Sequence, residues 1–258
     1  MKYTFNILFF LFLGLNIIAQ PYNQTDSNGK KIGKWNKKYD NGKTRFEGQF
    51  ENGYEVGTFY FYYPNGKLNS KLEYLEKGKL AVASIYYKNG SLQAKGKYYN
   101  KQKHDIWKYY SSSTELITKQ ESYNKGKKDG LWYIYYPNNT KVSEVMWKND
   151  VRDGIWKEYY KNGKLRLSAT FVKGKLEGEY ITYFMNGKIS RKGNYVNGKA
   201  NGAWISYNEK GIYTEYIMFN MGNIELERKY ENGKMIFEMD NKKHTVTDLR
   251  KKKDGEEE

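Results

Sequence analysis

The strongest constraint on the fold is an internal repeat of 24 residues. A Gly-x-Trp step, a tyrosine pair and an Asn-Gly turn recur along the chain, as in "GIWKEYYKNGK" at Gly154–Lys164. Aligned on the aromatic residue of the first step, eight units form one column: Trp35, Phe59, Ala83, Trp107, Trp132, Trp156, Tyr180 and Trp204. A second column has the same spacing: Phe50, Tyr74, Tyr98, Tyr123, Trp147, Phe171, Tyr195 and Phe219. Both columns contain one step of 25 in the same region, near Ser111–Glu115. Two columns that agree in this way predict a repeat architecture.

Each unit reads as two strands and two turns. In "GIWKEYY", the alternation of a strand places Trp156 and Tyr160 on one face and Tyr159 on the other. The chain then turns at "KNG". The return strand "KLRLSATF" places Leu167 and Phe171 on one face, and a second turn, "VKGKLEG", leads into the next unit.

The prolines indicate the type of the Asn-Gly turn. A two-residue loop would put Pro64 or Pro137 on a strand, where proline lacks a donor for the ladder. A three-residue loop accommodates both, because proline favours the first position of a type I turn. The last loop residue is then left-handed, which suits the usual glycine and is tolerated by Asn139 in "YPNNT".

Composition agrees with short strands and tight turns. Aromatic residues make up 17% of the chain, with 27 tyrosines and 25 glycines but only 3 prolines. We therefore predict an all-β fold, an elongated array of about eight 24-residue β-hairpin repeats that form one long twisted antiparallel sheet. About 16 strands would extend ~75 Å along the stacking axis. The chain has no cysteine, which excludes disulfides and thiolate metal sites.

Three glycines stand two residues before an aromatic of the second column: Gly48, Gly96 and Gly193. One interpretation is that each glycine lets an aromatic ring lie over the backbone. The other is that glycine permits a local twist or bulge.

The first residues predict export from the cytoplasm. "MKYTFNILFFLFLGLNIIAQ" has one early lysine, an apolar run of about 15 residues and a cut site after Ala19, the layout of a secretory signal peptide. The run is shorter than the ~20 residues of a membrane-spanning helix, and an uncleaved N-terminal anchor is the alternative. The predicted organisation is a signal peptide at 1–19, a short linker at 20–28, a repeat domain at 29–240 and a charged, disordered tail at 241–258. We expect an extracytoplasmic location, periplasmic, cell-surface or secreted.

The unit "G-x-W-x-x-Y-Y-x-N-G-K-L…Y-x-N-G-K-x-x-G" resembles the MORN-repeat variant found widely in bacterial proteins. The resemblance covers roughly Gly29 to Gly233, and its clearest copies are Gly130–Trp147, Gly154–Lys175 and Gly178–Lys199. It implies an elongated array of β-hairpins that serves in protein–protein contacts, dimerisation or phospholipid binding. Some bacterial relatives carry an antitoxin label. The pattern decays at Ala81–Ala83 and at Ser111–Thr114.

No catalytic or metal-binding constellation is evident in the sequence. The two histidines, His104 and His244, lie in distant parts of a long array. Asp129, Asp153 and Glu177 occupy equivalent repeat positions and would lie about 9.6 Å apart, too far for one ion to bridge. We therefore expect no enzyme activity, no cofactor and no metal.

A tyrosine ladder on one face is the first candidate for binding. The first tyrosine of each pair recurs on the face opposite the tryptophan column: Tyr62, Tyr86, Tyr110, Tyr135, Tyr159, Tyr183 and Tyr207. Tyrosine combines an apolar ring with a polar tip and suits protein interfaces. The ladder is thus a candidate surface for another protein, or for a second copy in a homodimer. Alternatively, these rings simply pack on one another across strands.

The turn lysines form the second candidate. The net charge of +16 favours acidic partners, although lysines in turns are more often simply part of a solvated surface. One edge of the array would carry Lys43, Lys67, Lys164 and Lys188, and the other would carry Lys79, Lys127, Lys175 and Lys199. They would bind an anionic lipid or an acidic glycan of the cell envelope. Nucleic acid is a less favoured partner, because a secretory signal separates the chain from it.

Overall fold

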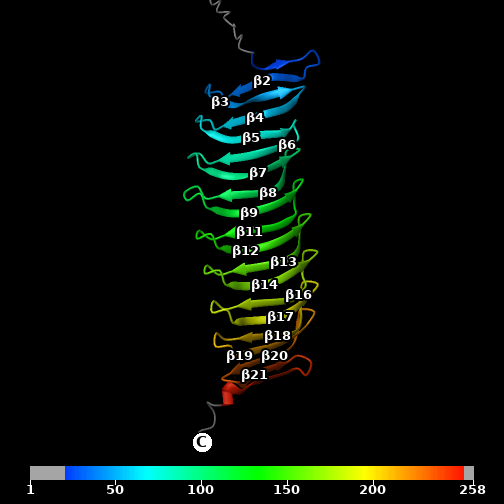
Figure 1. Ribbon diagram of the computed structural model, residues 1–258. Helices are drawn as coiled ribbons and strands as arrows, with labels where there is room; N and C mark the ends of the chain where they lie inside the picture. The colour runs from blue at the N-terminus through cyan, green and yellow to red at the C-terminus, as the bar shows by residue number, and fades with distance from the viewer. Residues whose placement is uncertain (1–20, 253–258) are drawn as a thin grey trace, which may run out of the picture.

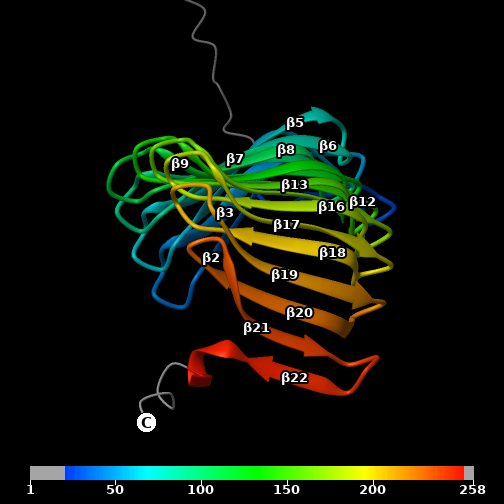
Figure 2. The same cartoon turned by 90° about the horizontal axis from the view of Figure 1, so that it is seen from below.

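The computed structural model describes residues 21–252, and these form a single open antiparallel sheet of 22 strands. The hairpins stack along one axis, with turns along both long edges, and the first and last described residues lie at opposite ends of the stack (Figure 1). Viewed along this axis, successive strands are rotated relative to one another (Figure 2), the twist expected of L-residues. The predicted all-β array of hairpins is confirmed.

The strands have the following bounds: β1 (Gln24–Thr25), β2 (Lys31–Lys38), β3 (Thr44–Glu51), β4 (Tyr54–Tyr62), β5 (Leu68–Glu76), β6 (Leu80–Tyr86), β7 (Leu92–Tyr99), β8 (Gln102–Tyr110), β9 (Ile117–Asn124), β10 (Lys127–Lys128) and β11 (Gly130–Tyr135). The second half comprises β12 (Lys141–Lys148), β13 (Val151–Tyr159), β14 (Leu165–Val172), β15 (Lys175–Leu176), β16 (Gly178–Tyr183), β17 (Ile189–Val196), β18 (Lys199–Tyr207), β19 (Tyr213–Asn220), β20 (Asn223–Glu231), β21 (Lys234–Asp240) and β22 (Thr245–Asp248). A short 3-10 helix, η1 (Leu249–Lys252), follows β22 and is the one helix among the described residues.

Three-residue turns close most of the hairpins along one edge of the sheet. In the first unit, the amide of Tyr39 donates to the carbonyl of Lys43 (2.8 Å) and Gly42 is left-handed, with φ of 79°. The sheet register shifts next to this turn, between Lys37 and Lys38. Asn139 takes the glycine position with φ of 64°. The predicted three-residue loop is therefore confirmed.

Two-residue turns close most of the hairpins along the other edge. Between β3 and β4, Asn52 and Gly53 are both left-handed, with φ of 51° and 83°, which defines a type I′ turn. The amide of Gly53 then donates to the carbonyl of Lys31 in β2 (2.9 Å). Gly198 repeats this bond to Leu176 (2.8 Å). Each tight turn is thereby attached to the strand two positions earlier, which joins successive units.

The core is a layer of aromatic rings on one face of the sheet. Here we call it the aromatic face; it carries the two aromatic columns. Trp107 is completely buried, and its ring centroid lies 4.8 Å from that of Tyr98. A Cβ atom on Gly96 would collide with the Trp107 ring, and the same relation joins Gly48 to Phe59. Gly193 and Trp204 form a third such pair. Ring packing over glycine, rather than twist alone, is the reason for these glycines.

Both ends of the array contain more strand than the sequence predicts. Residues 20–28, expected as a linker, include β1, which pairs with β2. The segment from Asn241, expected to be disordered, adds β22 to the free edge of β21, and Asp240 accepts the amides of Lys242 (3.0 Å) and Lys243 (3.1 Å) in the turn between them. An unpaired edge offers backbone partners even to a polar sequence, which explains this correction. The sheet also exceeds the expected 16 strands, because a ninth hairpin, β20–β21, continues it.

The expected signal peptide at 1–19 lies outside the described residues. Within residues 21–252, no helix has the length and apolar character needed to cross a membrane.

Candidate interaction surfaces of the sheet

The seven ladder tyrosines all lie on the face opposite the aromatic face, which we call the polar face. All seven are half-buried rather than fully exposed. Two are fixed by buried or half-buried carboxylates: Tyr62 Oη donates to Glu47 Oε1 (2.6 Å), and Tyr159 Oη donates to Glu144 Oε1 (2.7 Å). Burial and the bond to Glu47 raise the pKa of Tyr62 to about 12. These hydroxyls are therefore held in place and stay protonated near neutral pH.

The ladder rings do not stack on each other. Among the described residues, their ring contacts are those of Tyr135 with Tyr133 (6.1 Å between centroids) and of Tyr207 with Tyr213 (6.4 Å). Successive ladder positions are two strands apart, about 9.6 Å. Charged side chains occupy the intervening positions, such as Lys71, which interacts electrostatically with Tyr86. The polar face thus alternates aromatic and charged groups.

The second tyrosine of each pair has a structural function that the sequence analysis missed. Tyr39 Oη donates to the backbone carbonyl of Tyr62 (2.7 Å), and Tyr63 Oη donates to that of Tyr86 (2.7 Å). The same bond recurs from Tyr87 to Tyr110, from Tyr136 to Tyr159 and from Tyr160 to Tyr183. A donor and its acceptor are 23 residues apart, so the repeated Tyr-Tyr pair was a usable signal. These bonds attach each unit to the next.

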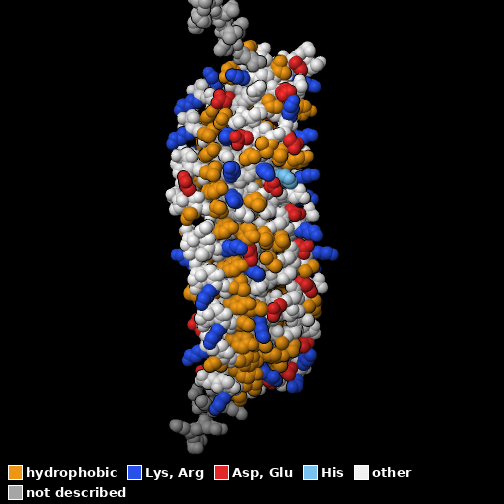
Figure 3. Space-filling model, viewed as in Figure 1, with side chains coloured by type: hydrophobic (Ala, Val, Ile, Leu, Met, Phe, Trp, Pro, Cys, Tyr) orange, Lys and Arg blue, Asp and Glu red, His pale blue; other side chains and the backbone are white. Residues whose placement is uncertain are grey.

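The eight turn lysines lie along the two edges as predicted, and all are exposed. Some also serve the fold: Lys43 Nζ donates to the carbonyl of Asn65 in the next turn (2.8 Å), and Lys188 Nζ donates to that of Lys210 (2.8 Å). Lysine and arginine side chains border both sides of a hydrophobic band that runs along the stack in Figure 3. The edges are cationic, but part of their hydrogen-bonding capacity is used within the sheet.

The recurrent acidic residues cap turns. Asp129 Oδ2 accepts the amide of Asn149 (3.4 Å), and Glu177 Oε2 accepts that of Asn197 (2.8 Å). Asp153 accepts the amide of Lys173 in the same way (3.4 Å). No group of three or more His, Asp or Glu side chains in residues 21–252 is arranged to hold a metal ion.

Comparison with known proteins agrees with the hairpin geometry. The family model of the MORN repeat variant matches residues 55–76, 128–149, 152–173 and 176–197. The chain carries MORN repeat variants. Each matched segment begins near the start of a strand that follows a tight turn, and it ends at or just before the next tight turn. The repeats of the family therefore coincide with the hairpins of the sheet. MORN repeats are generally protein-binding or membrane-binding modules.

Other comparisons add little to this assignment. No curated protein matches the chain. Among solved structures, the Photorhabdus luminescens Tc holotoxin pore with a mutated TccC3 is 13% identical to it, with a TM-score of 0.21. That match covers 80% of this chain but only 13% of the other.

One repeat unit contains an ion cluster around a buried carboxylate that the sequence did not reveal. Lys103 Nζ lies 5.1–5.2 Å from the ring centroids of Trp107, Tyr109 and Tyr123. Glu121, which is 3% exposed, lies 3.9 Å from that ammonium group. Burial lowers the pKa of Lys103. Burial opposes ionisation of Glu121 too, but bonds from Lys119, Tyr109 and Tyr123 outweigh it and lower the pKa of the carboxyl.

A lysine or arginine four residues before the aromatic residue of the first column is the sequence pattern that indicates this contact between an ammonium group and a ring. Lys31 lies 4.4 Å from the Trp35 ring centroid, and Lys128 lies 4.5 Å from that of Trp132. Such cations shield the rings of the aromatic face from water.

Proposed function

We propose that this protein is a non-enzymatic, extracytoplasmic scaffold that binds another protein through the polar face of its sheet. The observation that supports this proposal best is the polar face itself. Half-buried tyrosines recur on it in a fixed register across seven units, and no second layer covers it within residues 21–252. Tyrosines held in place lose little conformational freedom on binding, which favours their use in interfaces.

The partner surface that fits this face is acidic. The whole chain has a net charge of +16, and exposed lysines border the ladder along both edges. Opposite charges guide association and orient the partner, while the aromatic groups contribute most of the affinity. A repetitive surface also suits an elongated partner or a second copy of the chain.

The extracytoplasmic location is part of the proposal. It rests on the signal-like sequence of the first twenty residues. Detection of the mature chain, with a new N-terminus near residue 20, in the periplasmic or extracellular fraction would support it. Retention of Met1 in a cytoplasmic protein would contradict it.

Site-specific photocrosslinking tests the binding face. A photoreactive side chain replaces Tyr110 on the polar face or, as a control, Val246 on β22, which is 67% exposed. We expect one protein to crosslink from position 110 alone, to be displaced by the unlabelled chain, and to bind as a purified protein at about 0.5 M salt, where surface charges are screened. Equal crosslinking from both positions would contradict the proposal.

A binder of anionic lipid or acidic glycan is the second candidate, and the exposed lysines of both edges favour it. In that case Lys67→Gln with Lys127→Gln should weaken binding to vesicles that contain anionic lipid. Salt should abolish the same binding. The pair Tyr110→Ser and Tyr183→Ser, whose hydroxyls do not bond Glu47 or Glu144, should impair protein binding instead.

A further inference from the structure

One unit of the aromatic face lacks the aromatic residue of the first column. Strand β6 presents Ala81 and Ala83 to this face, and both are at most 1% exposed. Ala83 stands where the other seven units have an aromatic residue. The backbone pairing is nevertheless regular, since Ala81 lies directly between Tyr74 of β5 and Tyr98 of β7. The sheet continues through this unit, but its aromatic layer does not.

Regular units show what is missing. In the unit before, the Phe59 ring bridges Phe50 and Tyr74, with centroids 5.2 Å and 5.5 Å away. Near the C-terminal end, the Trp204 ring bridges its two neighbours in the same way: Tyr195 at 5.1 Å and Phe219 at 6.0 Å. No ring of β6 can bridge Tyr74 and Tyr98.

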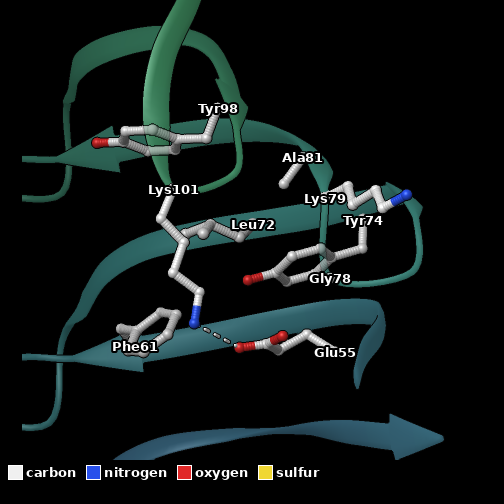
Figure 4. Close-up of a pocket in the computed structure, with 9 residues that line it drawn as sticks. All are labelled: Glu55, Phe61, Leu72, Tyr74, Gly78, Lys79, Ala81, Tyr98 and Lys101. Carbon is white, nitrogen blue, oxygen red and sulfur yellow. Dashed lines mark ion pairs between the residues drawn. The ribbon is translucent and has the colours of Figure 1, made fainter. Parts of the chain in front are cut away.

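A cavity of about 330 Å³ lies at this interruption. Its walls are apolar or aromatic, formed by Phe61, Leu72, Tyr74, Ala81 and Tyr98. Figure 4 shows the Tyr74 and Tyr98 rings on two sides of it, with Leu72 between them. Cavities of about 150 Å³ with apolar walls already accept benzene, so this one has room for a bicyclic ring.

Charged groups border the opening of the cavity. The side chain of Lys101 extends across the opening, and Lys101 Nζ lies 3.3 Å from Glu55 Oε1 (Figure 4). Lys79 also lines the cavity and is exposed. Among the residues that line the cavity, two lysines against one glutamate leave a net positive charge. A ligand with a carboxylate next to its apolar part would match this distribution.

We propose that this cavity is a binding site for an aromatic side chain of a partner polypeptide, adjacent to an acidic group of that partner. The incoming ring takes the place between Tyr74 and Tyr98 that a column aromatic fills in the neighbouring units. Edge-to-face contacts with both tyrosines hold the ring, and Lys79 and Lys101 attract the carboxylate. This inference goes beyond the proposed function, because the cavity lies on the aromatic face and the proposed partner surface is the polar face.

The test uses small probes and the full mature chain. N-acetyltryptophan, which carries a carboxylate, is compared with N-acetyltryptophanamide and with N-acetylcyclohexylalanine, which is apolar but not planar. Binding is followed by NMR through the methyl groups of Leu72, Ala81 and Ala83. We expect saturable shifts of these methyls, strongest for N-acetyltryptophan and weakest for the cyclohexyl compound. Unchanged methyl signals, or equal binding of the planar and non-planar probes, would overturn the proposal.

A matched pair of variants locates the site. Ala81→Phe fills the cavity, whereas Val82→Phe adds the same ring to the same strand on the polar face. We expect Ala81→Phe to weaken N-acetyltryptophan binding by about tenfold or more, the equivalent of the two lost ring contacts. Val82→Phe should bind like the wild type. Equal weakening by both variants would contradict the assignment.

A third variant tests the charged opening of the cavity without changing a buried side chain. Lys101 has a side chain that is 76% exposed, so Lys101→Glu should fold normally. It should remove the preference for N-acetyltryptophan over its amide, and an undiminished preference would contradict the role of the charged opening. Because the probes report on the cavity and photocrosslinking reports on the polar face, either proposal can fail while the other stands.

Discussion

The indole of Trp107 lies against Gly96 of the neighbouring strand. Any amino acid other than glycine at position 96 would place a side-chain atom inside the space that the ring occupies. The ring is fully buried, and a Cβ atom at position 96 would overlap three of its atoms. Gly96 itself has no left-handed φ, so the glycine is needed for space and not for backbone conformation. The packing of this ring therefore depends on the absence of a side chain at one position of the neighbouring strand.

The substitution Gly96→Ala should therefore destabilise the sheet by about 1–3 kcal/mol, the usual cost of overpacking a rigid core. Urea denaturation of the mature chain measures it. The double variant Gly96→Ala with Trp107→Tyr imitates a pair that occurs naturally in the chain, Ala169 with Tyr180. It should recover part of the loss, and an additive double variant would argue against the ring–glycine contact.

Removal of one inter-unit hydroxyl should have a smaller effect. Tyr63→Phe deletes the bond to the carbonyl of Tyr86 and should cost about 0.5–1.5 kcal/mol. Phe184 is a natural phenylalanine in this column, so Phe184→Tyr is the reverse experiment and should be neutral or stabilising. If both substitutions have the same sign and size, the hydroxyl bond is not what joins the units.

Acid should destabilise the fold through its buried carboxylates. Glu121 and Glu144 are 3% and 7% exposed, and each has a lowered pKa. Burial opposes ionisation at both sites, but bonds from Lys119 at Glu121 and from Lys141 at Glu144 outweigh it. A carboxyl with a lowered pKa in the folded state contributes stability above its unfolded pKa, about 4.3. That stability is lost as the pH falls through the lower folded-state value.

We therefore expect the free energy of unfolding to fall steeply below about pH 4.3 in the wild type. Glu121→Gln should reduce this slope and cost about 1–3 kcal/mol at pH 7, because Lys103 and Lys119 lose their partner while remaining partly solvated. Glu51→Gln, at an exposed carboxylate that forms an ion pair with the exposed Lys77, is the control. If the free energy of unfolding of Glu121→Gln fell with pH as steeply as that of the wild type, this carboxylate would be excluded as the acid-sensitive group.

Small-angle scattering should report a rod. The 22 strands occupy about 20 positions, because β10 and β11 share one side of β9 and β15 and β16 share one side of β14. At ~4.8 Å per strand the array is ~95 Å long. A particle of this length with the mass of one chain supports an open array with free faces. A mass of two chains would mean that one face is already covered by a second copy.

The sequence alone determined the period, the hairpins, the position of both turns and the three-residue geometry of one of them. These features depend on local chemistry: the alternation of a strand, the left-handed preference of the Asn-Gly step, and the fixed φ of Pro64 and Pro137. It also placed the ladder tyrosines on one face and the turn lysines along the edges, because both follow from register. The interpretation that Gly48, Gly96 and Gly193 lie under rings, one of the two that the sequence left open, came from the same alternation.

Only the tertiary structure decided which groups meet between units. The bond from Tyr39 to the carbonyl of Tyr62, the position of Lys103 over three rings and the cavity beside Ala81 all depend on how far each hairpin is displaced and rotated from the one before. β22 likewise forms because β21 leaves an edge unpaired, although its own sequence is polar. A repeat sequence specifies its unit through short-range chemistry. Contacts between units depend instead on how side chains from several strands are placed relative to one another, which the sequence of one unit does not determine.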